Sequence, residues 1–297
     1  MGYFRLWKRI SSNEIGISKR DFLNIMTIKE VLTWATKKLQ DSCPRPKFEA
    51  ELLLAYHLKK DRTFLHAFDD KEVNNIEAFK ALVERRANHE PYEYIVGEVS
   101  FYDVELNVEA GVLIPRPETE ILIDLVAEII ERENITSIAE IGVGSGAISV
   151  VLARKFPALN IVATDICDTP IKVANSNIKK YDVGDRVSVI KSSILDEVKH
   201  DVELVVSNPP YIANDFELEK NVGEYEPKEA LFGGVVGDEL LKQIVLDVKE
   251  RSIKYLACEM GYDQKEPMSQ FFNKIGVKSY KFYKDLAGFD RGFVVKF

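Results

Sequence analysis

One short segment of the sequence, Asn208-Pro209-Pro210-Tyr211, has residue types suited to amine chemistry. It follows an apolar run that ends at Ser207. Pro209 restricts Asn208 to an extended backbone and both prolines fix φ, so the segment is expected to be stiff. The prolines lack an N–H group, but their carbonyl oxygens remain acceptors, and Asn208 adds a side-chain carbonyl. The segment therefore predicts a rigid array of hydrogen-bond acceptors beside an aromatic ring.

Such an array suits a substrate with a planar –NH2 group, because two acceptors can hold its two hydrogens. The nitrogen of an amide or exocyclic amine is a poor nucleophile, since its lone pair is delocalised. Holding both hydrogens would point the lone-pair face at an electrophilic methyl group. The hydrogen bonds should strengthen as planarity is lost in the transition state. No general base is required, because the positively charged product nitrogen loses its proton easily. The structural alternative is a proline-stiffened turn that only ends a strand.

A second segment, Ala139 to Ala147, predicts a strand that enters a glycine-rich turn and then a helix. Its glycines allow a sharp turn and a close approach of the backbone to a ligand. About twenty residues further on, Asp165 ends the next predicted strand, where its carboxylate could accept two hydrogen bonds from a ribose diol. The turn also satisfies a dinucleotide-binding pattern, with alanine in the last place. This segment alone does not distinguish a dinucleotide-binding site, an S-adenosylmethionine-binding site and a turn that binds no ligand.

Alternating strands and helices must position these two segments. The predicted strands cover residues 137–141, 160–166, 187–191, 202–207, 254–260, 277–283 and 291–297. One predicted helix begins at Pro117, and the others cover residues 146–155, 169–180, 238–250 and 264–274. This alternation predicts an α/β sheet with helices on both faces. The last two strands have no long helix between them, so the final strand is expected to be antiparallel.

The chain before this sheet divides into three parts. Residues 26–90 have a helical pattern that opens with capping-box spacing between Thr27 and Glu30, and they predict a small helical bundle. Residues 91–114, with Tyr94-Ile95-Val96 and an alternating apolar run up to Val108, predict a β-hairpin. Residues 1–25 are expected to be a disordered extension or a mis-assigned start, with a basic transit peptide as the alternative. The predicted domains are therefore 1–25, 26–90, 91–114 and 115–297.

Composition excludes several other classes of protein. A net charge of −8 disfavours a broad surface for a phosphate backbone. No apolar run approaches the roughly 20 residues that span a bilayer. The cysteines and histidines lack the spacing of a disulfide framework or a metal site; they are Cys43, Cys167, Cys258, His57, His66, His89 and His200. We expect a cytoplasmic monomer that binds no metal, no membrane and no nucleic acid directly.

Five further segments are distinctive in combination. They are Gly111-Val112-Leu113-Ile114-Pro115-Arg116-Pro117-Glu118-Thr119-Glu120, residues 91–108 with Phe101-Tyr102, Tyr225-Glu226-Pro227 with Ala230-Leu231, Glu259-Met260-Gly261-Tyr262, and Asp285-Leu286-Ala287-Gly288 with Arg291. With the two segments above, they resemble the amino-methyltransferases that use S-adenosylmethionine. More narrowly, the chain resembles the peptide chain release factor glutamine methyltransferases from about Met26 to the C-terminus.

The resemblance implies a fold, a reaction and a set of site residues. The fold is a Rossmann-like seven-stranded methyltransferase sheet, with the small helical bundle recognising the substrate and joined to the sheet by the hairpin. The reaction is N5-methylation of the glutamine in the Gly-Gly-Gln motif of peptide chain release factors, with S-adenosyl-L-methionine as cofactor. The implied cofactor-binding residues are Gly142, Val143, Gly144, Ser145, Gly146, Asp165, Ser193 and Asn208. The residues implied to bind the substrate glutamine are Asn208, Pro209, Pro210 and Tyr211, and the implied catalytic residues are Asn208, Pro209 and Tyr211.

Some positions fit the family pattern less closely. The acidic residue that commonly ends the first core strand of the family is Glu140 in this chain, which is a mild change. Ser192-Ser193 stands where the family often has an acidic residue followed by an aromatic one, so the adenine contact carried over to Ser193 departs from that pattern. Secondary candidates for lining the site are Phe101, Arg116 and Glu118.

The main competing interpretation is a methyltransferase for adenine N6 or another amino group, acting on nucleic acid or another protein. Such enzymes share an Asn/Asp-Pro-Pro-aromatic loop, but those that act on nucleic acid must reach a flipped base and hold phosphates. Residues 214–229 carry six acids and two lysines, a local charge of −4 beside the expected entrance. This charge favours a basic protein surface as partner, with a merely solvated acidic loop as the alternative. A non-catalytic helical interaction module would need a degenerate α/β half, and the intact Gly142–Gly146, Asp165 and Asn208–Tyr211 speak against it. A dehydrogenase would leave Asn208–Tyr211 without a purpose, and nothing in the chain positions a hydride acceptor.

Overall fold

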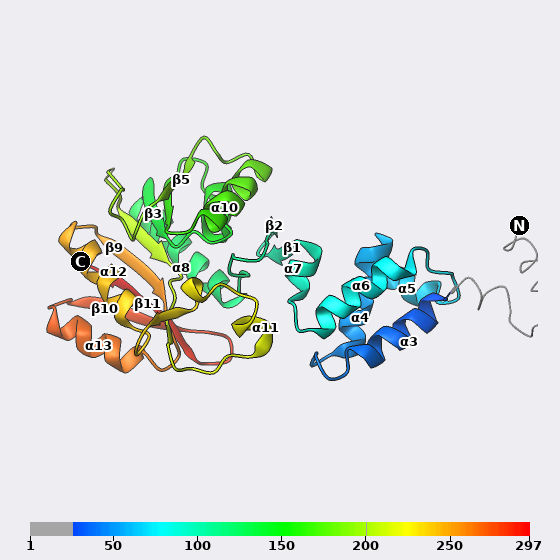
Figure 1. Cartoon of the computed structure of the whole chain (residues 1–297). Coiled ribbons are helices and arrows are strands. Elements are labelled where there is room, and N and C mark those ends of the chain that lie inside the picture. The colour runs from blue at the N-terminus through cyan, green and yellow to red at the C-terminus, as the bar shows by residue number, and fades with distance from the viewer. Residues whose placement is uncertain (1–25, 200) are drawn as a thin grey trace, which may run out of the picture. The chain divides into compact units, whose positions relative to one another are not determined.

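The computed structural model describes residues 26–199 and 201–297. The predicted extension over residues 1–25 lies outside the described residues. The chain forms two compact units that divide between Val96 and Gly97, and Figure 1 shows a helical unit and a unit built on a sheet.

The first unit consists of short helices around one apolar core. The helices are α3 (Ile28–Lys38), α4 (Pro46–Leu58), α5 (Arg62–Ala67), α6 (Ile76–Ala87) and α7 (Tyr92–Val96). The predicted capping box is confirmed, because the Thr27 side chain accepts from the backbone of Glu30 and the Glu30 side chain accepts from the backbone of Thr27. Leu53, Phe79 and Val83 are fully buried in this core.

The hairpin prediction is wrong at its beginning. Tyr94-Ile95-Val96 is helical, since it belongs to α7, whose first turn is closed by a hydrogen bond from the Tyr94 N–H to the Pro91 carbonyl. Ile95 is buried in the core of the helical unit. Gly97 then takes a positive φ of 84°, which ends the helix. The hairpin proper is β1 (Glu98–Phe101) with β2 (Val104–Asn107), and it belongs to the second unit.

The second unit is built on a seven-stranded sheet in the order β10-β11-β9-β6-β3-β4-β5. These strands are β3 (Ser137–Ile141), β4 (Asn160–Asp165), β5 (Val187–Lys191), β6 (Leu204–Ser207), β9 (Tyr255–Glu259), β10 (Ser279–Lys284) and β11 (Asp290–Lys296). Neighbouring strands are parallel except that β11 runs antiparallel to both β9 and β10. The predicted α/β sheet and its antiparallel last strand are therefore confirmed.

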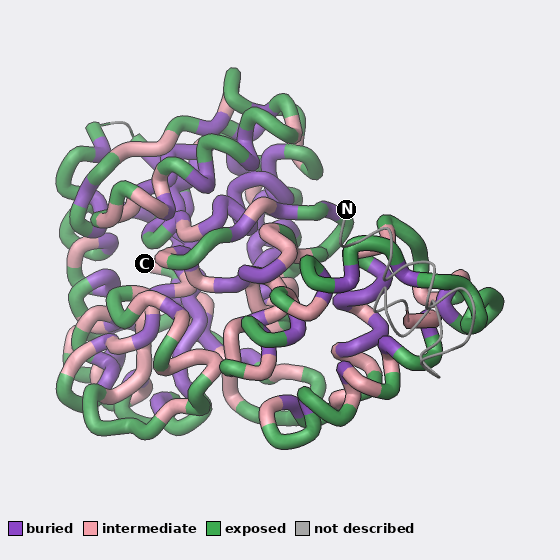
Figure 2. The backbone as a smooth tube through the Cα atoms, turned by 45° about the vertical axis from the view of Figure 1, so that its right-hand side comes forward, coloured by how far each residue is buried: buried purple, intermediate pink, exposed green. Residues whose placement is uncertain are grey.

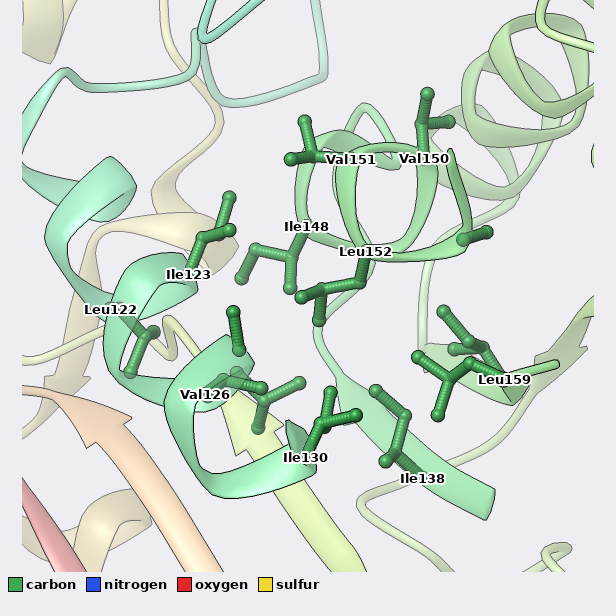
Figure 3. Close-up of a cluster of buried hydrophobic side chains, with 14 of the residues drawn as sticks. Leu122, Ile123, Val126, Ile130, Ile138, Ile148, Val150, Val151, Leu152 and Leu159 are labelled. Atoms are coloured by element: carbon green, nitrogen blue, oxygen red, sulfur yellow. The ribbon is translucent and has the colours of Figure 1, made fainter. Parts of the chain in front are cut away.

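Helices cover both faces of this sheet. They are α8 (Glu118–Glu133), α9 (Ala147–Lys155), α10 (Asp168–Lys180), α12 (Glu239–Glu250) and α13 (Lys265–Lys274). Alternate residues of a strand enter different cores: Ile138 faces the α8–α9 side and Ala139 faces the α12–α13 side. Figure 3 shows Leu122, Ile123 and Val126 of α8 gathered against side chains of α9 and β3. The central strands β6 and β9 are buried along their whole length. Figure 2 shows buried residues in the interior of the tube and exposed residues along its outer loops.

The remaining short elements lie between β6 and α12. They are β7 (Ile212–Ala213), α11 (Lys220–Gly223), the 3-10 helix η1 (Lys228–Ala230) and β8 (Phe232–Gly234), with β7 parallel to β8. Within residues 26–199 and 201–297, no helix is long and apolar enough to cross a membrane. The same residues contain no group of three or more His, Cys, Asp or Glu placed to hold a metal ion.

Candidate active site

The carboxyl ends of β3 and β6 meet where the strand order reverses. The chain moves outward from β3 to β4 and β5 and then returns to the other side of β3 with β6. Ligands of open α/β sheets bind at such a switch point. Ile141 and Ser207 are register partners, and the Ser207 hydroxyl donates to the Ile141 carbonyl at 2.8 Å. The residues that follow them, Gly142 and Asn208, therefore lie side by side.

A cleft of about 910 Å³, including its open mouth, lies above this junction. Its lining joins segments that are far apart in the chain. The lining residues include Gly111, Leu113, Gly142, Gly144, Asp165, Ile166, Ser192, Ser193, Ile194, Asn208, Pro209, Pro210, Pro227, Glu229 and Leu240. We call Gly142, Gly144, Asp165 and Ser193 the glycine wall, and Asn208, Pro209 and Pro210 the proline wall.

The glycine-rich turn presents only part of itself to the cleft. Gly142 and Gly144 line it, while Val143 and Ser145 are buried behind the turn and, like Gly146, are not among the described residues of the lining. Gly146 has a φ of 83° and begins α9, and a Cβ atom there would approach Ala174 of α10 to 3.3 Å. Gly146 therefore allows α9 and α10 to pack closely, which holds the turn in place.

Asp165 ends β4, as predicted, and lines the cleft. Its Oδ2 accepts from the Gly144 N–H at 3.2 Å and its Oδ1 from the Cys167 N–H at 3.0 Å. Burial raises the pKa of Asp165 above its usual value, and these backbone hydrogen bonds oppose that rise. A carboxylate has about four lone-pair sites, so capacity remains on both oxygens for a ligand.

Ser193 of the glycine wall and Glu140, which precedes the glycine-rich turn, differ in exposure. Ser193 lines the cleft next to Ser192 and Ile194. Glu140 does not face the cleft: it is buried on β3 and accepts a hydrogen bond from the Ser149 hydroxyl of α9. Burial raises the pKa of Glu140 to about 8, and the Ser149 hydrogen bond opposes that rise. Glu140 thus connects the strand and the helix on either side of the glycine-rich turn.

On the proline wall, Asn208 is held by a chain of side chains from three elements. Its Nδ2 donates to Thr119 Oγ1 of α8 at 3.0 Å. The Thr119 hydroxyl donates in turn to Glu259 Oε2 at the end of β9, at 2.5 Å. Thr119 and Glu259 are both buried. Burial raises the pKa of Glu259 to about 7, and the Thr119 hydrogen bond and Arg291 oppose that rise.

Sequence reasoning gave Thr119 and Glu259 no role, although both stand in the segments that carry the family resemblance. Burial would have marked both as candidates, because threonine is mostly exposed and glutamate is almost never fully buried in a protein core. Spacing along the chain reveals neither burial nor proximity across the fold.

Tight backbone contacts support the rest of the proline wall. A Cβ atom at Gly233 of β8 would lie 2.5 Å from the Pro210 carbonyl oxygen and 2.9 Å from the Tyr211 Cα, so only glycine fits there. The Gln264 side chain donates to the Tyr211 carbonyl at 2.8 Å. Tyr211 is itself not among the described lining residues, and its ring packs against the apolar core on the α12–α13 side. Burial raises the pKa of Tyr211 to about 12, with Glu259 adding to the rise.

The secondary candidates have structural partners. Phe101 is buried in the core on the α8–α9 side and does not line the cleft among the described residues. Arg116 forms an ion pair with Glu226 at 2.5 Å, and the other Glu226 oxygen accepts from the Ile114 N–H at 3.1 Å. Glu118 begins α8 near Glu259, where its charge raises the Glu259 pKa.

The acidic segment needs one correction. Glu226, counted as one of six acids at the entrance, is buried, and Arg116 neutralises its charge. Glu226 therefore holds the segment to the loop before α8. The exposed charges are those of Asp215, Glu217, Glu219, Glu224 and Glu229 against Lys220 and Lys228. The segment remains acidic, and Glu229 lies at the cleft.

Two family models match the chain. The PrmC N-terminal domain matches residues 30–97, and the methyltransferase small domain matches residues 118–225. Among similar proteins, a release factor glutamine methyltransferase of Dictyoglomus turgidum is 38% identical and covers 86% of this chain and 94% of its own length. A release factor glutamine methyltransferase of Clostridium botulinum is also 38% identical, over 82% of this chain and 90% of its own length.

The fold also occurs in solved methyltransferases. The human METTL16 catalytic domain, solved in complex with an RNA hairpin, superposes with a TM-score of 0.53 at 18% identity, over 64% of this chain and 75% of that one. At this identity the likeness concerns the fold alone.

Proposed function

The chain belongs to the release factor glutamine methyltransferase family, and we propose that it transfers a methyl group from S-adenosylmethionine to the side-chain nitrogen of the glutamine in the Gly-Gly-Gln motif of release factors. The observation that carries this proposal is the proximity of the two walls. Asn208, the predicted amide-binding residue, lies beside Gly142 at the head of the glycine-rich turn.

The cleft fits the proposed cofactor in its chemistry. Gly142 and Gly144 offer backbone without side chains, and a Cβ atom at Gly144 would meet no atom within 4 Å. Asp165 offers a carboxylate with free lone pairs at the place where a ribose would lie. Ile166 and Ile194 add apolar surface suited to a flat ring. When bound, S-adenosylmethionine supplies an electrophilic methyl group on a sulfonium.

The proline wall would bind and orient the substrate amide. The Asn208 Nδ2 is engaged by Thr119, so its Oδ1 is left to accept from the substrate –NH2 group. The Pro209 backbone carbonyl is a further acceptor in a loop whose φ angles are restricted, while the Pro210 carbonyl packs against Gly233 of β8. Fixing both hydrogens of the amide aims the lone-pair face of its nitrogen at the methyl group. As the nitrogen becomes more positive, the acceptors bind it more strongly, which lowers the barrier.

The competing assignment, methylation of an adenine or another amino group, uses the same acceptors. The acidic segment favours a protein substrate over a nucleic acid. It follows the proline wall in the chain, reaches the cleft at Glu229 and exposes five carboxylates that would repel phosphates, those of Asp215, Glu217, Glu219, Glu224 and Glu229. We further propose that the enzyme acts in the cytoplasm as a monomer, with the release factor as its protein partner.

The deciding experiment is incubation with methyl-labelled cofactor and a release factor, either intact or with its tip glutamine replaced. Label is expected on the intact factor alone. A nucleic-acid arm, with a mixture of DNA and RNA in place of the factor, tests the competing assignment. Label on the replaced factor or on nucleic acid would refute the proposal.

A further inference from the structure

Behind Asn208 lies a buried chain of hydrogen bonds, of which the methyl-transfer proposal uses only the bond between Asn208 and Thr119. Asn208 Nδ2 donates to Thr119 Oγ1 at 3.0 Å, and the Thr119 hydroxyl donates to Glu259 Oε2 at 2.5 Å. The three residues come from the β6 end, the start of α8 and the end of β9. Thr119 and Glu259 are 4% and 1% exposed, so water cannot stand in for either partner.

The chain of hydrogen bonds has a direction because the threonine hydroxyl has one proton. A carboxylate can only accept hydrogen bonds, so the Thr119 hydroxyl must direct its proton at a charged Glu259. The Thr119 oxygen is then an acceptor towards Asn208, and only the –NH2 end of the Asn208 amide can face it. The carbonyl end, Oδ1, is thereby turned away from Thr119.

We infer that Glu259, acting through Thr119, sets the orientation of the Asn208 amide, so that an acceptor and not a donor meets the substrate –NH2 group. This inference rests on the proposed function for its consequence in catalysis, but its structural part does not. Glu259 and Thr119 are positioning residues here, since neither touches the substrate.

A protonated Glu259 would reverse the chain. The carboxyl could then donate to Thr119, and Thr119 could donate to Oδ1, so the –NH2 end of Asn208 would face the cleft. Burial brings the pKa of Glu259 to about 7, within reach of ordinary assay conditions. The charges that act on Glu259 are those of Arg291 on β11, Glu118 at the start of α8 and Arg116 just before it. Three neutral groups also face Glu259, since its charge raises their pKa values: Tyr283 on β10, Tyr211 after β6 and Cys258 on its own strand.

The first test needs no substrate. Protein labelled with ¹⁵N-asparagine gives a side-chain –NH2 signal for Asn208, assigned by its loss in Asn208→Ala. That signal should shift between pH 6 and pH 8 with a midpoint near 7. The shift should vanish in Glu259→Gln and in Thr119→Val. It should persist in Glu140→Gln, which alters an equally buried glutamate that takes no part in these hydrogen bonds. A wild-type signal that does not titrate, or one that titrates unchanged in Glu259→Gln, would overturn the inference.

The second test is kinetic. Thr119→Val should lower kcat about 10-fold, the value of one lost orienting hydrogen bond, with KM for the release factor within about twofold. Thr119→Ser keeps the hydroxyl and should recover most of kcat. The wild-type kcat should fall as pH drops below about 7, and this fall should be absent from Glu259→Gln. Equal losses in Thr119→Val and Thr119→Ser would contradict the inference.

The two tests separate failure of this inference from failure of the proposed function. A wild-type protein with the expected titration but without methylation of the factor would leave the orienting chain intact and refute the methyl-transfer proposal. Methylation of the tip glutamine without any titration of the Asn208 signal would support the methyl-transfer proposal and refute the inference about Glu259 and Thr119.

Discussion

The glycine wall and the proline wall of the cleft are built in different ways. The glycine wall consists mostly of backbone, and its supports lie within the continuous stretch of chain from β3 to α10: Gly146 against Ala174, and Asp165 against the Gly144 N–H. The proline wall depends on contacts from remote segments: the Thr119 and Glu259 side chains hold Asn208, and the absence of a side chain at Gly233 leaves room for residues 210–211. Because their supports differ, the two walls should be separable by mutation: we expect changes in the glycine wall to affect cofactor binding and changes in the proline wall to affect orientation of the substrate.

The largest expected effect is on the proline wall. Asn208→Ala removes the side-chain acceptor and should lower kcat for the release factor about 100-fold or more. The dissociation constant of the cofactor should stay within about twofold, because the glycine wall is unchanged. Single-turnover methylation and calorimetric cofactor titration measure the two quantities. Asn214→Ala, exposed on the same loop, is the matched control. Weakened cofactor binding in Asn208→Ala would show that the walls are not separable.

The converse change is Asp165→Ala on the glycine wall. Loss of hydrogen bonds to a charged group should weaken cofactor binding by about 10- to 100-fold. At saturating cofactor, kcat should recover to near the wild-type value, since the proline wall is intact. Asp168→Ala, whose exposed carboxylate pairs with Lys191 at 2.7 Å, serves as control. Unchanged cofactor affinity in Asp165→Ala would remove Asp165 from the binding residues.

A smaller effect is expected at the acidic segment next to the proline wall. Replacing Asp215, Glu217 and Glu219 by lysine should lower kcat/KM for the whole release factor about 10-fold at low salt, and less at high salt. A short Gly-Gly-Gln peptide should be methylated almost as before. The control exchanges Glu128, Glu131 and Glu250, exposed elsewhere on α8 and α12, for lysine. Equal losses for factor and peptide would argue against docking on this segment.

The smallest effect distinguishes the buried carboxyls behind the two walls. Glu140 has a pKa of about 8 in the folded protein against 4.5 ordinarily, so the folded state binds its proton more tightly than the unfolded state. The free energy of unfolding should therefore fall as pH rises from about 5 to about 8. Glu140→Gln removes this loss, so its stability relative to wild type should improve by at most about 1.4 kcal/mol per pH unit.

Urea denaturation at several pH values measures this difference, with Glu128→Gln as an exposed control. The kinetic pH dependence assigned to Glu259 should survive in Glu140→Gln. A stability difference that does not vary with pH would mean that Glu140 is not protonated in the folded state.

Much of the fold was predictable because its signals are local. Apolar periodicity located the seven strands and the helices between them, and the missing helix before the final strand predicted the antiparallel direction of β11. Tyr94-Ile95-Val96 was misread as part of the hairpin, because three apolar residues do not distinguish a short helix from a strand. The contact with the helical core, together with Gly97 at positive φ, decided for α7.

For the site, the sequence by itself determined the chemistry of each wall: prolines restrict φ, asparagine carries a carbonyl, and a glycine turn followed by an aspartate offers a ribose-binding surface. Only the tertiary structure decided which groups support that chemistry. Glu226 is buried in an ion pair with Arg116 and so is not part of the acidic surface, and Glu259 is linked to Asn208 through Thr119. The physical reason is that hydrogen bonding and burial depend on distances in space, and the strand order brings together residues that chain spacing keeps apart.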